Sequence, residues 1–131
     1  MIYAPYIAIV AAFALIYLPR AVVTVEMRKL EGGYNNNDPR GQQAQLAGLG
    51  RRALAAHHNA GEAFAPFSIG VLAAMQRSQK LDAIAGISIA FVVVRSAFMA
   101  AYLKDAATLR SSMWALGMLC ITALMVIAII G

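Results

Sequence analysis

The chain has 131 residues, of which 61% are hydrophobic and 13% are charged, whereas a typical soluble domain has about 45–50% apolar and about 25% charged residues. Because the apolar residues gather in long runs, the composition excludes an ordinary soluble domain and predicts one membrane domain over residues 1–131. The net charge of +5 is read as a membrane-topology signal, and we expect no nucleic-acid partner.

The first predicted helix covers residues 2–28. A helix needs about 20 apolar residues to cross a hydrocarbon core about 30 Å thick, and this run is long enough although Pro5, Pro19 and Arg20 interrupt it. We expect this segment to be a membrane span and not a signal peptide, because it lacks a basic n-region and its apolar run is too long.

The second predicted helix covers residues 39–76 and contains the least apolar of the four candidate spans. Asp38 is suited to cap its start and Pro39 to occupy its first position. An unbroken helix of this length would measure roughly 58 Å, so its first turns would project from the membrane. Gly41, Gly48 and Gly50 weaken this helix or mark close helix packing.

The third and fourth predicted helices cover residues 81–103 and 108–130, and both are apolar enough to span a membrane. The links on either side of the third helix are short, so sequential helices should be antiparallel. The sequence therefore predicts an all-α membrane protein, an up-down bundle of four transmembrane helices.

The basic residues are distributed unequally between the two sides of this bundle. Two cations flank the second connection (Arg77 and Lys80), against seven in or beside the first and third connections, namely Arg28, Lys29, Arg40, Arg51, Arg52, Lys104 and Arg110. Because cytoplasmic loops carry the excess of Lys and Arg, we expect the first and third connections in the cytoplasm and the termini in the periplasm.

Polar residues stand inside the predicted spans, where they are rare and are functional candidates. Asn59 and Glu62 share a helix face with His58, and Arg52 lies two turns before Asn59 on that face. The third helix carries Arg95 and Tyr102, seven residues apart, and Arg110 and Ser111 begin the fourth. These helix ends meet on one side, which predicts a basic, hydrogen-bonding pocket open to the cytoplasm.

Other interpretations of these residues remain open. Glu62 and Arg95 could pair as structural ions, and Arg51, Arg52 and Arg110 could contact anionic lipid headgroups. We expect no metal, because His57 and His58 point apart on a helix and His58 with Glu62 supplies only two ligands.

The segment "AHHNAGEAFAPF", residues 56–67, resembles the second-helix signature of the MAPEG proteins, the membrane-associated proteins in eicosanoid and glutathione metabolism. Six residues match this signature in register, namely Ala56, His57, Asn59, Glu62, Pro66 and Phe67. The segment "YNNNDPRGQQAQL" resembles a loop of bacterial members, and the four-helix plan covers the whole chain. The resemblance implies a MAPEG-like homotrimer, of bacterial type and in the bacterial inner membrane, that binds glutathione as co-substrate between subunits near the cytoplasmic surface.

The resemblance also implies roles for individual residues. Asn59, Glu62, Tyr102, Arg110 and Ser111 match family ligand positions, and Arg28 matches a first-helix arginine loosely. Arg110 resembles the arginine that stabilises the glutathione thiolate and is the expected catalytic residue. The expected ligand-binding residues, for glutathione or a lipid headgroup, are therefore Arg28, Arg52, His58, Asn59, Glu62, Arg95, Tyr102 and Ser111.

The chain departs from the pattern of characterised members at several positions. Arg51 stands where eukaryotic enzymes have glutamate, His58 where several have arginine, Phe98 where a prostaglandin synthase has histidine, and Trp114 where a tyrosine is found. The resulting hypothesis is a glutathione-dependent transferase or peroxidase for lipophilic electrophiles. The alternative is a non-catalytic membrane module that binds lipid or joins a larger membrane complex.

Overall fold

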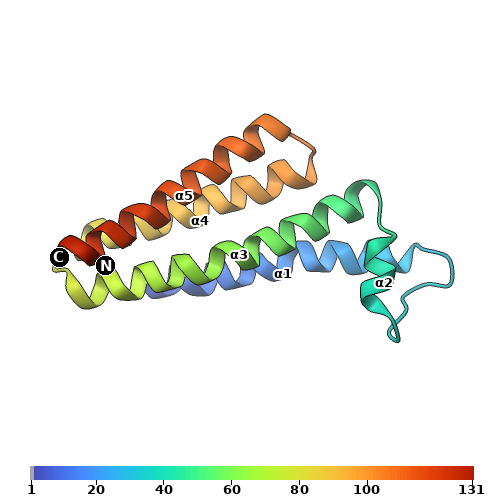
Figure 1. Ribbon diagram of the computed structural model, residues 1–131, viewed down its shortest axis with the longest axis horizontal. Helices are drawn as coiled ribbons and strands as arrows, with labels where there is room; N and C mark the ends of the chain where they lie inside the picture. Colours follow the sequence, from blue (N-terminus) through green and yellow to red (C-terminus); the bar gives the residue numbers. More distant parts are fainter. Residues whose placement is uncertain (1) are drawn as a thin grey trace.

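The computed structural model describes residues 2–131 and contains five helices within that range (Figure 1). They are α1 (Ala4–Arg28), α2 (Pro39–Ala44), α3 (Gly48–Arg77), α4 (Leu81–Leu103) and α5 (Ala107–Ile130). The four long helices run up and down, α1 beside α3 and α4 beside α5, and the short α2 lies across the end of the α1–α3 pair. The two termini lie together at the opposite end of the bundle.

Three of the long helices, α1, α4 and α5, are long and apolar enough to cross a membrane. The longest helix, α3, has 30 residues and does not reach the same hydropathy, because its first half carries the arginines, histidines and glutamate discussed above. Its role as a fourth span stays a prediction. The ends of α1, α4 and α5 lie within two residues of the bounds expected from the sequence.

The predicted continuous helix over residues 39–76 is wrong, because α2 ends at Ala44 and α3 begins only at Gly48. Between them Ala47 has an extended backbone, with φ −123° and ψ 173°. Gly48 has φ +50°, a left-handed conformation that glycine adopts far more readily than other residues. The Asp38 side chain does cap α2, since its Oδ1 accepts a hydrogen bond from the Gly41 amide at 3.0 Å.

The larger of two core clusters runs from the middle of the bundle toward the termini, and a smaller cluster of Val23, Met27, Leu46 and Ala53 lies near the α2 end. The rings of Phe67 and Phe91 stack at 3.8 Å between centroids, and Ala8 and Ala12 allow α1 to lie close to α3. A Cβ added to Gly70 would lie 3.3 Å from Leu124 Cβ, so this glycine permits the close approach of α3 and α5. These contacts set the relative positions of the helices that carry the polar residues.

His57 ties α3 to α1 in the turn that precedes Pro19. Pro19 has no N–H to donate to the carbonyl of Leu15, and its ring disturbs the preceding turn of α1. His57 Nδ1 lies 2.7 Å from the carbonyl oxygen of Ile16 in this turn. Because a carbonyl oxygen only accepts, Nδ1 must carry the proton and donate it. His57 is therefore a structural contact between two helices.

Candidate functional site

Two neighbouring hollows open between α3 and α5, each of about 200 Å³. We call the first the polar hollow; α4 also lines it, and its residues are Asn59, Phe98, Tyr102, Arg110, Ser111 and Trp114. We call the second the Glu62 hollow, and its residues are Asn59, Glu62, Ala63, Pro66, Trp114 and Met118. The two hollows share Asn59 and Trp114 and therefore lie next to each other.

Arg95 stands behind the polar hollow and holds Asn59 in place. Its side chain is buried, its Nη2 donates a hydrogen bond to Asn59 Oδ1 at 2.8 Å, and its guanidinium lies over the Phe98 ring at 4.1 Å. A Cβ on Gly117 would lie 3.3 Å from Arg95 Cδ, so this glycine makes room for the arginine stem. Since Asn59 Oδ1 is occupied, the amide NH₂ group is left to donate into the hollow.

Tyr102 and Arg110 form the mouth of the polar hollow. The Tyr102 ring meets Phe98 edge to face at 5.4 Å, and the Arg110 guanidinium lies 4.7 Å from the Tyr102 ring centroid. Arg110 lies near the start of α5, whose N-cap residue, Ala106, provides no side-chain cap. The unpaired N–H groups of the first turn therefore add partial positive charge beside the guanidinium.

The lining of the polar hollow is rich in hydrogen-bond donors. Asn59, Tyr102, Arg110, Ser111 and Trp114 each bring an N–H or O–H group, and among the described residues no carboxylate lines the hollow. Such a lining suits an anion, because a negative charge would find a guanidinium, a helix N-terminus and several neutral donors there. The carboxylate of Glu62 lies in the adjoining hollow instead.

Glu62 itself is exposed on the single chain, and within residues 2–131 it forms no ion pair. The structural pairing with Arg95 that the sequence left open is not formed here, since Arg95 donates to Asn59. The Glu62 carboxylate thus remains available to a ligand or to a second chain.

Four of the expected ligand-binding residues line neither hollow, namely Arg95, which stands behind the polar hollow, and Arg52, Arg28 and His58. Arg52 Nε and Nη2 each donate a hydrogen bond of 3.3 Å to the carbonyl oxygen of Leu103, the last residue of α4. Arg52 Nη1 lies 3.9 Å from Asp105 Oδ2. Arg28 is exposed in the last turn of α1. His58 is exposed, and its ring centroid lies 5.6 Å from that of His57.

Sequence reasoning missed Met118, Ala63 and Pro66 as lining residues and treated Phe98 and Trp114 only as departures from the family pattern. The available signal was helical spacing, since Arg110, Trp114 and Met118 follow one another at intervals of four on one face of α5. Within residues 2–131 no group of three or more His, Cys, Asp or Glu residues is placed to hold a metal ion.

Comparison with known proteins gave one match. The family model described as the MAPEG family matches residues 4–130, nearly the whole chain. The searches of curated proteins and of solved structures found no match.

Proposed function

The chain belongs to the MAPEG family and is an integral membrane protein with three apolar helices, and on this premise we propose that it is a glutathione-dependent transferase or peroxidase for lipophilic electrophiles. The observation that carries the proposal is the polar hollow, lined by donors and bounded by Arg110, beside a carboxylate in the adjoining Glu62 hollow. Glutathione has the matching chemistry, with two carboxylates, one ammonium group and a thiol.

Arg110 is the proposed catalytic residue. A guanidinium near a helix N-terminus favours a thiolate over a thiol, and a pKa lowered by one unit corresponds to about 1.4 kcal/mol. In a transfer reaction the thiolate sulfur attacks an electrophilic carbon, the new C–S bond forms, and the leaving group departs with its electron pair. Ser111 and the Asn59 amide would donate to the peptide, and Glu62 would accept from its ammonium group.

The exposed face of α3 supports a homotrimer. Its exposed or half-buried residues alternate at intervals of four and three, as in a coiled-coil seam, through Arg51, Ala55, His58, Glu62, Ala65, Ile69, Leu72 and Gln76. Ionisable residues at membrane depth face protein interiors or aqueous cavities rather than lipid. We therefore propose that α3 lines the axis of a trimer and that a neighbouring copy completes the hollows.

The proposed location is the bacterial inner membrane, with the first and third connections cytoplasmic and the termini periplasmic. The seven-to-two distribution of cations supports this orientation. In it, the polar hollow opens toward the cytoplasm, where a soluble thiol would enter, while an apolar substrate would arrive from the bilayer.

The experiment measures the ultraviolet absorbance of the thiolate when glutathione is added to the purified protein near neutral pH, together with conjugation of a small apolar electrophile. We expect Arg110→Ala to abolish the thiolate signal and to reduce conjugation by about tenfold or more. Lys104→Ala is the matched control, because Lys104 is an exposed cation at the same end that lines neither hollow.

A lipid phosphate is the second candidate ligand, because a donor-lined hollow suits it equally and Trp114 brings no phenol for acid–base chemistry. In that case the protein is a non-catalytic module that holds lipid or joins a larger membrane complex. The non-catalytic module would be supported by two results together. The wild-type protein would give no thiolate signal and bind no glutathione at millimolar concentration, and it would retain anionic lipid that Arg110→Ala loses.

A further inference from the structure

His58 lies in the middle of the exposed face of α3, on the seam that the proposed trimer would bury. Arg51, seven residues earlier, and Ala65, seven residues later, are exposed on the same line, because seven residues make nearly two full turns. The adjacent His57 points in another direction and bonds to the Ile16 carbonyl oxygen on α1. One histidine of the pair is therefore used inside the fold, and the other stays on the surface.

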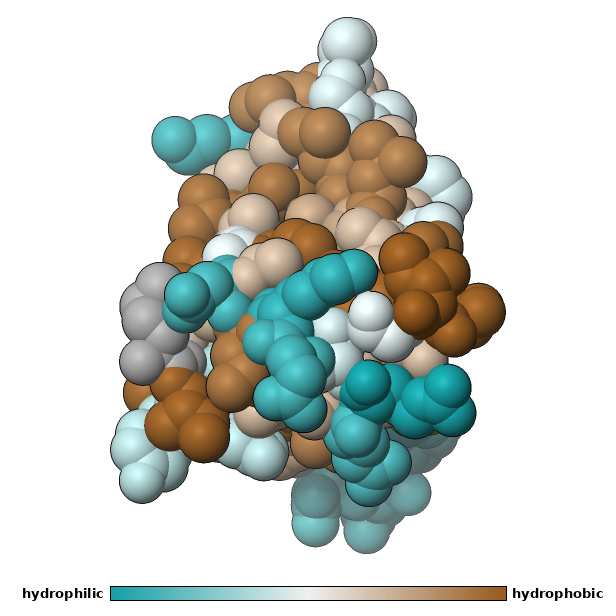
Figure 2. Space-filling view, turned by 90° about the vertical axis from the view of Figure 1, so that its left-hand side faces the viewer, coloured by the Kyte–Doolittle hydropathy of each residue, from teal (hydrophilic) through white to brown (hydrophobic). Residues whose placement is uncertain are grey.

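The surface that suits lipid lies mainly on other helices. α1, α4 and α5 are apolar enough to span a membrane, and their exposed residues include large hydrophobic side chains such as Val10, Val93 and Leu119. Figure 2 looks onto the end of the bundle with the termini and shows hydrophobic residues over the upper side, where α4 and α5 run, with hydrophilic residues gathered below. On α3, by contrast, an exposed histidine and an exposed glutamate suit contact with protein rather than with lipid.

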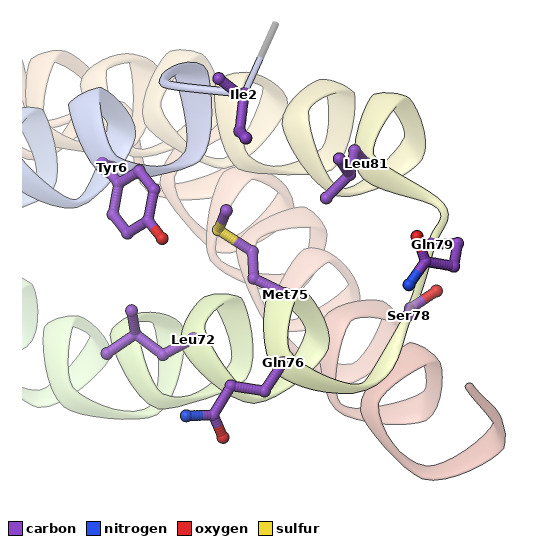
Figure 3. A pocket seen from close by; sticks show the side chains of 8 residues that line it. All are labelled: Ile2, Tyr6, Leu72, Met75, Gln76, Ser78, Gln79 and Leu81. Carbon is purple, nitrogen blue, oxygen red and sulfur yellow. The ribbon is translucent and has the colours of Figure 1, made fainter.

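The same face continues to the end of α3 near the termini. A pocket of about 430 Å³ at this end is walled in part by Leu72 and Gln76 (Figure 3). Both residues are exposed and belong to the seam, so a neighbouring copy packed along α3 would cover this side of the pocket. From Arg51 to Gln76 the seam measures roughly 38 Å, enough to hold copies together through most of a membrane.

The symmetry of the proposed trimer brings the three His58 side chains together. Copies of a membrane protein share one orientation in the bilayer, so the three-fold axis that relates them runs across the membrane. Each residue on the axis-facing side of α3 then meets its own equivalents at a single depth. Ala55, one turn before His58 on this face, carries only a methyl group and leaves room for three rings.

Three imidazoles around one point form a ligand set for a divalent transition metal. Zn²⁺ is bound in open tetrahedral sites by three histidines and a water, with Zn–N distances of about 2.0–2.1 Å. The expectation that no metal binds considered one chain, in which His58 and Glu62 supply only two ligands, and within residues 2–131 no group of three is found. Three copies supply three equal imidazoles. Arg51 lies about 10 Å away along the helix, where salt largely screens its charge.

Glu62 provides the second partner that a metal-bound histidine needs. Such a histidine donates its other ring N–H to a carboxylate or a carbonyl, which orients the imidazole. Glu62 lies one turn after His58 on the same side of α3, and within residues 2–131 it forms no ion pair. Three carboxylates close to one axis repel one another unless a cation compensates them, and Zn²⁺ brings two positive charges. A carboxylate has two oxygens, so Glu62 can also face its hollow.

We propose that His58 of three copies binds one Zn²⁺ ion on the trimer axis, with Glu62 orienting the imidazoles, and that the ion holds the three α3 helices together. The inference rests on the trimer of the proposed function. It does not rest on glutathione chemistry, because His58 lines neither the polar hollow nor the Glu62 hollow.

The test uses the untagged full-length protein in detergent, freed of metal by a chelator and titrated with Zn²⁺ alone. Calorimetry should give one Zn²⁺ ion per three chains, and the melting temperature of the trimer should rise with Zn²⁺. We expect affinity for Zn²⁺ to fall about a hundredfold or more in His58→Ala and about ten- to a hundredfold in Glu62→Gln. Gln76→Ala is the matched control, since Gln76 is a polar residue on the same seam and should leave Zn²⁺ binding unchanged.

Two measurements on the wild-type protein need no variant to fold. X-ray absorption at the zinc edge should show three imidazole nitrogens at about 2.0–2.1 Å, and a shell of oxygen or sulfur ligands would contradict the proposal. The detergent-corrected mass separates this proposal from the one on which it rests. A trimer that binds no Zn²⁺, or that binds it equally well in His58→Ala, would overturn the metal site alone. A chain that stays monomeric with Zn²⁺ present would overturn both the trimer and the metal site.

Discussion

Two faces of α3 hold adjacent polar residues in different surroundings. On one face, Asn59 lines a hollow with Arg110 and the N-terminus of α5, whereas the preceding residue, His58, lies on the exposed face. The difference teaches that α3 does not set the kind of ligand by itself. The kind of ligand depends on the side chains opposite α3, which α4 and α5 place on the first face and, in the proposed trimer, neighbouring copies place on the second. The buried residues of α3 hold both faces in place against the rest of the bundle.

The largest expected effect comes from Phe67→Ala, in the core behind both faces of α3. Phe67 is fully buried and stacks on Phe91, and its removal leaves a cavity. This change costs about 3–5 kcal/mol in soluble cores, and we expect about 2–3 kcal/mol here, because lipid supplies no hydrophobic driving force between helices. Reversible unfolding in detergent would measure it, and the binding of glutathione and of Zn²⁺ should both weaken.

Phe13→Ala is the control for this change, because Phe13 is half exposed on α1 and its removal leaves no enclosed cavity. It should cost well under about 1 kcal/mol. If Phe67→Ala disturbed only one of the two sites, the core would not be what holds both faces in place.

The second largest effect is expected from Arg95→Met, which keeps an unbranched apolar stem and removes the guanidinium. Asn59 Oδ1 then loses its donor, and we expect a loss of about 1–2 kcal/mol in the free energy of unfolding. Glutathione binding should fall about tenfold, because the Asn59 amide is free to rotate, while Zn²⁺ binding at His58 should be unchanged.

Ser96→Ala serves as the control for Arg95→Met. Its hydroxyl donates only to the Val92 carbonyl of its own helix, so neither site should respond. Equal losses of glutathione and Zn²⁺ binding in Arg95→Met would show that the two faces are not independent.

A smaller effect is expected at the break between α2 and α3. Gly48→Ala places a Cβ on a residue with φ +50°, which should cost about 1 kcal/mol and increase proteolysis around residues 45–48. Gly86→Ala, at a helical glycine with open space around it, should instead be neutral or stabilising by up to about 1 kcal/mol. A stabilised Gly48→Ala would mean that the two helices can join into one.

The smallest effect is expected from Gly117→Ala. The added Cβ would lie 3.3 Å from Arg95 Cδ and should push that side chain by a few tenths of an ångström. We expect a loss below about 1 kcal/mol and a glutathione affinity lowered about two- to threefold, measured by calorimetry. Unchanged affinity would show that Asn59 does not depend on the exact position of Arg95.

Much of the helix layout was accessible from the sequence, and parts of the site were too. Their positions on the predicted helices placed Asn59, Tyr102 and Arg110 at one end of the bundle. The three residues line the polar hollow, and their role in binding a ligand stays a prediction. Spacing could not choose between Asn59 and Glu62 as the partner of Arg95, because both share one face of α3. It also did not indicate that Arg52 would bond to the end of α4.

The sequence by itself determined the three apolar helices and their ends, because a span requires about 20 apolar residues whatever surrounds it. The six residues of the segment 56–67 that match the MAPEG signature carried the family resemblance, and the family match bears it out. Only the tertiary structure decided where α3 begins, which side chain Arg95 holds, and which of the two adjacent histidines bonds to α1. Those features depend on how closely residues far apart in the chain approach one another, and that distance is set by packing, which local patterns do not encode.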